Sequence, residues 1–145
     1  MGGMKKSYSV LMADDSPDDR FFIKRHLGEL PNVLICGEVE DGVEAISYLA
    51  GEGLYADRVR YPFPDLLLLD LKMPRKGGYE VLDWIKSQSF SDLTVFVVSN
   101  SDLSEDRLKC RLLGASAFCP KGLSVMEQAL FMVELEKWIQ SRSGG

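Results

Sequence analysis

The chain has 145 residues, 46% of them hydrophobic, and a formal net charge of −5 at pH 7. This length suits one domain with a substantial core, and the acidic balance disfavours nucleic-acid binding, which needs a basic surface. No apolar run approaches the roughly 20 residues of a membrane span, and the N-terminus lacks the apolar stretch of a signal peptide. We therefore expect a cytoplasmic protein with neither a nucleic-acid nor a membrane partner.

The cysteines and the histidine exclude several kinds of site. Cys36, Cys110 and Cys119 lie far apart, and His26 is the single histidine. An odd number of widely spaced cysteines argues against a disulfide framework or a zinc site. One histidine gives no support to a histidine metal cluster or a Ser-His-Asp triad. We expect reduced thiols that are mostly buried as small apolar side chains.

The first elements in chain order are a strand, a helix and a second strand. Residues 8–13 are an apolar run typical of a buried strand. Ser16 and Pro17 then begin a helix as its N-cap and first helical residue, and Pro31 stops it. A second strand is expected over residues 33–39.

The middle of the chain is expected to hold a helix, a long loop and a central strand. A helix begins at Asp41-Gly42, and residues 51–64 form a loop that contains two glycines and two prolines. Residues 66–69 are four leucines, whose length and flanks favour a central parallel strand. Another helix is expected after Gly77-Gly78.

The last third of the chain repeats the alternation of strand and helix. Residues 95–98 form a buried strand that ends at Ser99. The next helix has Ser104 as its N-cap and Gly114 as its stop. The final strand and helix are expected at residues 117–119 and 124 to about 141.

Five strands that alternate with five helices predict an α/β fold of the (βα)5 type. Such a fold has a five-stranded, doubly wound parallel sheet with helices on both faces and right-handed crossovers. Ligands of these sheets bind beyond the carboxyl ends of the strands. The functional site is therefore expected at that edge.

Polar residues follow four of the five strands. Asp14 and Asp15 follow the first, Asp70 the third, Ser99 the fourth and Lys121 the fifth. Each alone is ordinary in a turn or at the surface, but together they place three acids, a hydroxyl and a lysine at one edge. Clustered carboxylates repel one another and attract a hard cation such as Mg²⁺, and a carboxylate facing that cation can attack phosphorus.

These motifs resemble those of response-regulator receiver domains. The resemblance covers about residues 7 to 140 and implies a flavodoxin-like strand order of 2-1-3-4-5. It rests on Asp14-Asp15, on Asp70-Leu71-Lys72-Met73-Pro74 with Gly78, on Ser99, and on the run from Gly114 to Lys121.

The resemblance also implies a role for each site residue. Asp70 would accept the phosphoryl group, and Lys121 would pair with it. Mg²⁺, for which Mn²⁺ or Ca²⁺ can substitute, would be bound by Asp15, by Asp70, by the backbone carbonyl of Lys72 and, through water, by Asp14. Ser99 and Phe118 would be the switch residues.

A subgroup is also indicated. The long loop over residues 51–64, the Met73-Pro74-Arg75-Lys76 run and the absence of an output domain are similar to phytochrome-associated single-domain response regulators. The resemblance implies a receiver domain over residues 7–141 and no further domain. It also implies a sensor histidine kinase, of which a phytochrome is one candidate, or a phosphotransfer protein as the partner.

Three residues depart from the usual receiver pattern. Lys72 is cationic where receivers often carry a neutral or acidic residue. Asn100 stands where a small residue is usual, and Gly122 stands where proline is common. These departures bear on the kinetics of the site more than on its existence.

Two other functions compete with a phosphorylated switch. A pseudo-receiver keeps the fold as a binding module but lacks an essential acid or lysine, whereas Asp15, Asp70 and Lys121 are all present. An aspartate-nucleophile phosphatase needs a second acid two positions after the nucleophile, where this chain has Lys72. We therefore expect a phosphoacceptor rather than an enzyme, with the pseudo-receiver as the alternative.

The final helix carries two apolar stripes when its residues are placed at about 100° each. The stripe expected to cover the sheet consists of Met126, Ala129, Leu130 and Val133. The second stripe, on roughly the opposite side, consists of Phe131, Leu135, Trp138 and Ile139. Because one helix on a sheet cannot bury both faces in its own domain, the second stripe predicts a homodimer interface.

Overall fold

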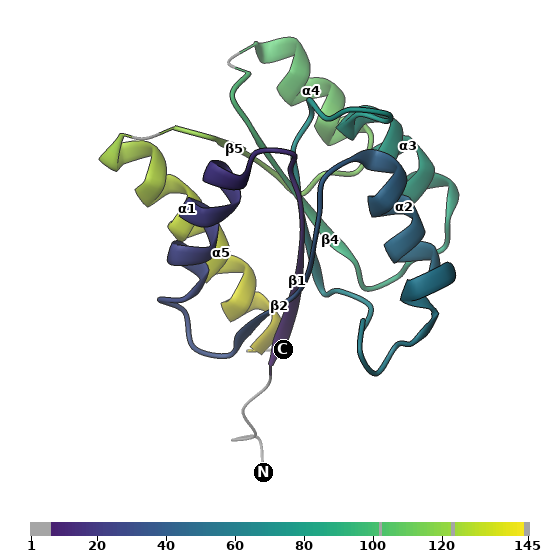
Figure 1. Ribbon diagram of the computed structural model, residues 1–145. Coiled ribbons are helices and arrows are strands. Elements are labelled where there is room, and N and C mark those ends of the chain that lie inside the picture. Colours follow the sequence, from purple (N-terminus) through teal and green to yellow (C-terminus); the bar gives the residue numbers. More distant parts are fainter. Residues whose placement is uncertain (1–6, 102, 123, 144–145) are drawn as a thin grey trace.

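The computed structural model describes residues 7–101, 103–122 and 124–143. Five strands form one parallel sheet in the order β2-β1-β3-β4-β5, which confirms the predicted fold class and strand order (Figure 1). The strands are β1 Tyr8–Ala13, β2 Val33–Val39, β3 Leu66–Leu69, β4 Thr94–Ser99 and β5 Ala117–Pro120.

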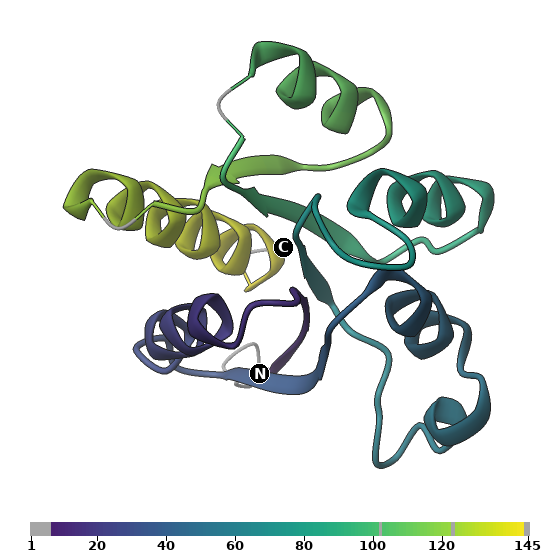
Figure 2. The same ribbon diagram turned by 45° about the horizontal axis from the view of Figure 1, so that its top comes forward.

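Helices cover both faces of this sheet. Helices α1 and α5 lie on one face, and α2, α3 and α4 lie on the other (Figures 1 and 2). The four leucines of β3 are buried between the two layers, which explains why this strand is apolar throughout. The helices are α1 Pro17–Leu27, α2 Gly42–Ala50, α3 Gly78–Ser87, α4 Ser104–Leu112 and α5 Val125–Ser143.

The predicted N-cap of α1 and the predicted start of α2 are confirmed. The Ser16 hydroxyl accepts a hydrogen bond from the Asp19 amide at 3.2 Å, and Pro17 is the first residue of α1. Asp41 caps α2, since its carboxylate accepts from the Glu44 amide at 2.8 Å.

The prediction of Ser104 as an N-cap is wrong. Ser104 is the first helical residue of α4, and Leu103 occupies the cap position without a side-chain hydrogen bond. The helix begins there because the Leu103 carbonyl already accepts from the amides of Asp106 and Arg107, at 3.1 and 3.3 Å. A serine in the sequence marks the neighbourhood of a helix start but not its exact register.

The loop over residues 51–64 is packed against α2. It contains a short 3-10 helix, η1 Gly53–Ala56, and its Tyr55 ring lies 4.7 Å from that of Tyr48. The Arg58 guanidinium donates to the Leu49 carbonyl at 2.9 Å, so it satisfies a backbone group at the end of α2. The long loop is therefore an ordered part of the domain.

The two apolar stripes of α5 lie on the sides opposite to those predicted. Phe131, Leu135 and Trp138 are only 4%, 1% and 7% exposed and pack in the core between the sheet, α1 and α5, and Ile139 packs against the same core. The other stripe faces outward, since Met126, Leu130 and Val133 are 69%, 50% and 47% exposed. The prediction that Phe131, Leu135, Trp138 and Ile139 form a dimer face is therefore wrong.

The physical reason is the apolar groove between the sheet and α1 that α5 must fill. Trp138 reaches across it, with its ring 5.3 Å from that of Tyr8 and its indole nitrogen donating to the Thr94 hydroxyl at 3.2 Å. Phe131 meets α1 through the His26 ring, at 6.2 Å. The larger aromatic side chains cover the sheet because they bury more apolar area there than the smaller stripe would.

The cysteines behave as predicted. Cys36, Cys110 and Cys119 are all unpaired thiols, and the last two are buried. Burial raises the pKa of the Cys119 thiol to about 12, which makes it unreactive. In the part of the chain that the structure describes, no helix is both long and apolar enough to cross a bilayer.

Candidate functional site

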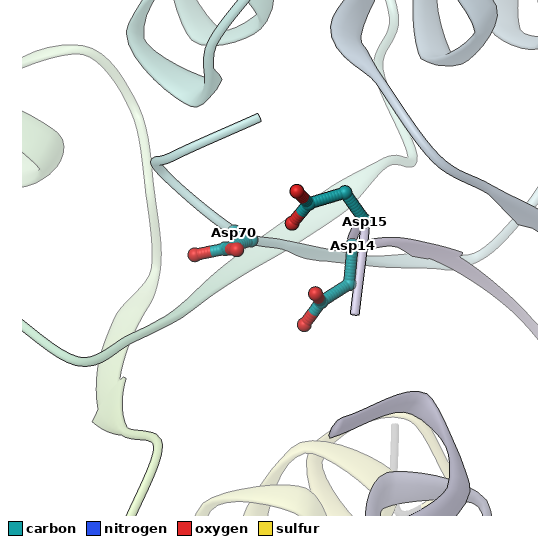
Figure 3. A group of neighbouring side chains, drawn as sticks. All are labelled: Asp14, Asp15 and Asp70. Carbon is teal, nitrogen blue, oxygen red and sulfur yellow. The ribbon is translucent and has the colours of Figure 1, made fainter. Parts of the chain in front are cut away.

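Three carboxylates meet where β1 and β3 end. The two strands are neighbours, and the pairing of Ala13 with Leu69 brings the residues that follow them to the same level. Oxygens of Asp14, Asp15 and Asp70 all lie within 4.8 Å of one another (Figure 3). Asp14 and Asp70 are buried, whereas Asp15 is exposed. The structure thus brings together the three acids that the sequence placed at this edge.

Lys121 reaches into this cluster from the end of β5. Its ammonium nitrogen lies 2.9 Å from an oxygen of Asp14 and 3.0 Å from an oxygen of Asp70. A third carboxylate, that of Asp19 on α1, lies 2.8 Å from the same nitrogen. The side chain of the lysine is 8% exposed and is held by three ion pairs at once.

The contact of Asp19 with Lys121 was not predicted from the sequence. Asp19 follows Asp18 in the first turn of α1, where acidic residues are common because they stabilise the helix N-terminus. Because helix stabilisation already explains an acid at this position, the sequence does not suggest that Asp19 also contacts Lys121. The indication in the sequence is its position, since the first turn of α1 follows directly on the acidic pair at the end of β1.

The charges of the cluster shift the pKa values of two groups. Burial alone would lower the pKa of Lys121, but the carboxylates of Asp19, Asp14 and Asp70 raise it above its usual range, so the ammonium is retained. Burial raises the pKa of Asp70, although Lys121 partly offsets this effect. Three carboxylates share one ammonium here and Asp15 adds a fourth negative charge beside them, so a further cation would be stabilised.

The donor set fits a hard divalent cation. Carboxylate oxygens are the ligands that Mg²⁺ and related ions prefer, and the exposed Asp15 leaves one side open to solvent. Both oxygens of Asp14 already have partners, because one accepts from the Ser16 amide at 2.9 Å and the other pairs with Lys121. This arrangement suits Asp14 to act through water, and leaves Asp15 and Asp70 as the better direct ligands.

Ser99 lies beside Lys121 at the end of β4. It is buried, and its carbonyl accepts from the Lys121 amide at 2.9 Å, so the backbone of the lysine is anchored to the serine. The Ser99 hydroxyl accepts from the Ser101 amide at 3.1 Å. Ser99 is thus joined through its backbone to the lysine that pairs with Asp70.

Phe118 lies on the neighbouring strand and faces α4. It pairs with Val97 in the sheet, is half-buried, and has the Arg107 guanidinium 4.8 Å from its ring centre. Together with Arg107 and Glu134 it lines a hollow between α4 and α5. The structure thus places Phe118 next to the site but not among the carboxylates.

Gly122, which follows Lys121, lies against a side chain at the start of α5. A Cβ atom at Gly122 would lie only 1.6 Å from a carboxylate oxygen of Glu127. That carboxylate is held at the start of α5, where the Ser124 hydroxyl lies 3.0 Å from it and accepts from the Glu127 amide at 3.1 Å. The glycine therefore leaves room for a side chain of α5.

Known proteins share this sequence pattern. A family model described as response regulator receiver domain matches residues 10–130. The nitrate/nitrite response regulator protein NarL of Escherichia coli (strain K12) is 33% identical over 116 residues, which are 79% of this chain and 48% of NarL. A protein-glutamate methylesterase/protein-glutamine glutaminase of Pyrococcus horikoshii is 29% identical over 118 residues, or 81% of this chain and 29% of that protein. The chain thus spans about half the length of NarL and less of the methylesterase.

Solved structures share the fold over almost their whole length. The phosphorylated cyanobacterial phytochrome response regulator RcpA matches with a TM-score of 0.78 and 29% identity, and the match covers 91% of this chain and 93% of RcpA. The Mn²⁺-bound form of response regulator Rcp1 matches with a TM-score of 0.73 and 26% identity, over 89% of this chain and 91% of Rcp1.

Proposed function

Because the chain belongs to the response regulator receiver domain family, we propose that it accepts a phosphoryl group on Asp70 from a sensor histidine kinase or a phosphotransfer protein. The observation that carries this proposal is the buried carboxylate of Asp70, 3.0 Å from the Lys121 ammonium and beside two further acids. The receiver unit is proposed to span residues 7–141 and to act in the cytoplasm.

The chemistry is a phosphoryl transfer between two side chains. An oxygen of Asp70 forms a bond to phosphorus while the P–N bond of the donor phosphohistidine breaks, and the released imidazole nitrogen takes up a proton. Lys121 already touches Asp70, so its ammonium is positioned to pair with the phosphoryl oxygens. The Ser99 hydroxyl at the end of β4 is proposed to donate to the same group.

Mg²⁺ is the proposed cofactor, with Mn²⁺ or Ca²⁺ as substitutes. When bound, the cation supplies positive charge that offsets the carboxylates and the phosphoryl oxygens. The proposed ligands are Asp15, Asp70, the backbone carbonyl of Lys72 and, through water, Asp14. The mutual distances of the three carboxylates and the Mn²⁺-bound form of the related Rcp1 support this proposal.

The proposed switch couples Ser99 to Phe118. A hydroxyl that turns toward a phosphoryl group on Asp70 leaves its hydrogen bond with the Ser101 amide. Phe118 lies on the adjacent strand beneath Arg107, and its ring can then change its contact with α4. Such a change would shift the equilibrium between two conformations of the surface formed by α4, β5 and α5.

The upstream kinase is proposed to be of the phytochrome type. RcpA, which matches the chain over most of its length, is described as a phytochrome response regulator. We also propose a homodimer, formed through the exposed apolar side of α5 instead of the side predicted from the sequence. On α4, the exposed Leu108 lines a hollow that also contains Glu134 of α5.

Intact-mass measurement tests the function directly. Incubation of the purified chain with phosphoramidate or acetyl phosphate and Mg²⁺ is expected to add the mass of one phosphoryl group, and chelation of the metal is expected to prevent this. Asp70→Asn should abolish the adduct because the nucleophilic oxygen is lost. Asp83→Asn, at an exposed aspartate of α3, is the control and should be phosphorylated normally.

Two results would contradict the proposal. An adduct of undiminished yield on the Asp70→Asn variant would move the phosphoacceptor to another residue. A wild-type chain that is never phosphorylated, by small donors or by a phosphorylated kinase, would favour the pseudo-receiver, a binding module without the chemistry.

A further inference from the structure

The segment between β3 and α3, residues 71–77, follows directly on the proposed phosphoacceptor. It contains Lys72, whose backbone carbonyl is a proposed metal ligand, and it is neither helix nor strand. Within it, Arg75 has a φ of 65°, in the left-handed region that residues with a Cβ adopt at a cost in free energy. Something outside the segment must stabilise this conformation.

An ion pair with the start of α2 provides that stabilisation. The Arg75 guanidinium donates from Nε to a carboxylate oxygen of Asp41 at 2.8 Å, and its Nη2 lies 2.7 Å from the same oxygen. The other oxygen of Asp41 accepts from the Glu44 amide at 2.8 Å. One buried carboxylate therefore joins the first turn of α2 to the segment that follows Asp70.

Backbone contacts fix the same segment at both ends. The Gly42 amide donates to the Lys76 carbonyl at 2.9 Å, and a Cβ at Gly42 would lie 2.2 Å from that oxygen. The Gly78 amide donates to the Leu71 carbonyl at 2.9 Å, and a Cβ at Gly78 would lie 2.4 Å from the Asp70 carbonyl. Between these anchors, Arg75 is the side chain whose charge pairs with α2.

We propose that Arg75 is a positioning residue: through its ion pair with Asp41 it holds residues 71–77 so that the Lys72 carbonyl faces the acidic cluster. This inference rests on the proposed function. Arg75 itself touches none of the acids that would bind the cation. Its side chain is 57% exposed, and exposed ion pairs contribute little to global stability, so its loss leaves a folded protein.

The sign of the effect on Mg²⁺ affinity distinguishes positioning from simple electrostatics. Removal of a cationic side chain near the cluster should strengthen Mg²⁺ binding if only charge matters. Arg75→Gln is expected to weaken it, by about tenfold, which is the effect typical of losing a residue that orients a metal ligand. Titration calorimetry with Mg²⁺ alone measures the affinity, and thermal melting checks the fold.

The neighbouring Lys76→Gln is the matched control. It removes the same charge from the same segment, but no ion pair of its side chain is present among the described residues. It should leave Mg²⁺ affinity unchanged or slightly higher. Arg75→Lys keeps the charge without the planar guanidinium and should restore part of the affinity, which also gives a folded comparison if Arg75→Gln is unstable.

A double-mutant cycle tests whether Arg75 acts through Asp41. Asp41→Asn keeps a side chain that caps α2 and removes the charge that binds Arg75. If the pair acts as a unit, Asp41→Asn with Arg75→Gln should bind Mg²⁺ no more weakly than either single variant. Additive losses would show that the two residues act separately and would overturn the proposed coupling.

The remaining outcomes distinguish failure of this inference from failure of the proposed function. A wild type that binds Mg²⁺ and is phosphorylated, with an Arg75→Gln variant that binds Mg²⁺ as tightly as Lys76→Gln, overturns the positioning role alone. A wild type that neither binds Mg²⁺ nor is phosphorylated overturns both the proposed function and the positioning role.

Discussion

Lys72 carries a positive charge beside a cluster that is proposed to hold a cation. Lys72 is exposed to solvent. Hydrogen bonds from Ser101 and Tyr79 lower the pKa of Asp106 on α4, and the Lys72 charge adds to that effect. The Lys72 charge therefore acts on α4, and among the described residues it forms no ion pair with an acid.

We predict that Lys72→Asn tightens Mg²⁺ binding. Loss of one unit charge near the cluster removes like-charge repulsion worth about 1 kcal/mol, or roughly fivefold in affinity at low salt. The difference should shrink as salt is added, because exposed charges are screened. Calorimetric titrations at two ionic strengths measure both effects.

Lys137→Asn is a suitable control for this prediction. Lys137 lies on α5, is exposed, and pairs with Glu134 at 3.8 Å, so its loss should leave Mg²⁺ affinity unchanged. Equal affinities of wild type and Lys72→Asn at low salt would show that the ammonium points away from the cluster.

Helix α5 illustrates how an element acquires its orientation. Both of its apolar stripes have the spacing of a helix face, but they contact different surroundings. The stripe with Phe131, Leu135 and Trp138 fills the groove between the sheet and α1, and the stripe with Leu130 and Val133 faces outward. Burial of the aromatic side chains outweighs burial of the smaller aliphatic ones.

Alanine substitutions on the two sides of α5 should differ sharply in cost. Phe131→Ala is expected to lower the free energy of unfolding by about 3–5 kcal/mol, as a large side chain is removed from a packed core. Leu130→Ala is expected to change it by less than about 0.5 kcal/mol, since this side chain is half exposed. Urea denaturation followed by circular dichroism measures both values. A larger loss for Leu130→Ala than for Phe131→Ala would reverse the assignment of the two sides.

Across the molecule as a whole, exposed apolar residues occur on both α5 and α4. They are Met126, Leu130 and Val133 on α5 and Leu108 and Leu112 on α4. A hollow lined by Arg107, Arg111 and Glu134 lies between the two helices. Charges of both signs beside apolar residues allow a surface to pair with a second copy of itself across a two-fold axis.

We predict that charge on this surface dissociates the proposed homodimer. Leu130→Glu with Val133→Glu should convert a dimer into a monomer in light scattering without lowering the melting temperature, because both residues are exposed. Val59→Glu, at a fully exposed loop residue, should remain dimeric. The same measurement with phosphoramidate shows whether phosphorylation shifts the equilibrium. If the wild type is monomeric at micromolar concentration both with and without phosphorylation, this surface would instead be expected to bind a kinase or another protein.

The alternation of strands and helices, and the edge at which the site lies, could be predicted from the order of the residues. Asp14, Asp15, Asp70, Ser99 and Lys121 could be placed together because the carboxyl ends of parallel strands meet at one edge, whatever the details of packing. The identity of the acids and of the lysine then indicated the kind of chemistry. These conclusions depend on local patterns and on chain order, which a sequence carries directly.

Which side of α5 faces the sheet could not be predicted in this way. The same holds for the contact of Asp19 with Lys121 and for the pairing of Arg75 with Asp41. Helical spacing defines two stripes on α5 but not the groove that either must fill. The contacts of Asp19 and Arg75 join segments that are distant along the chain. Such contacts depend on how the elements pack against one another, because a shift of one helical turn would move each pair out of reach.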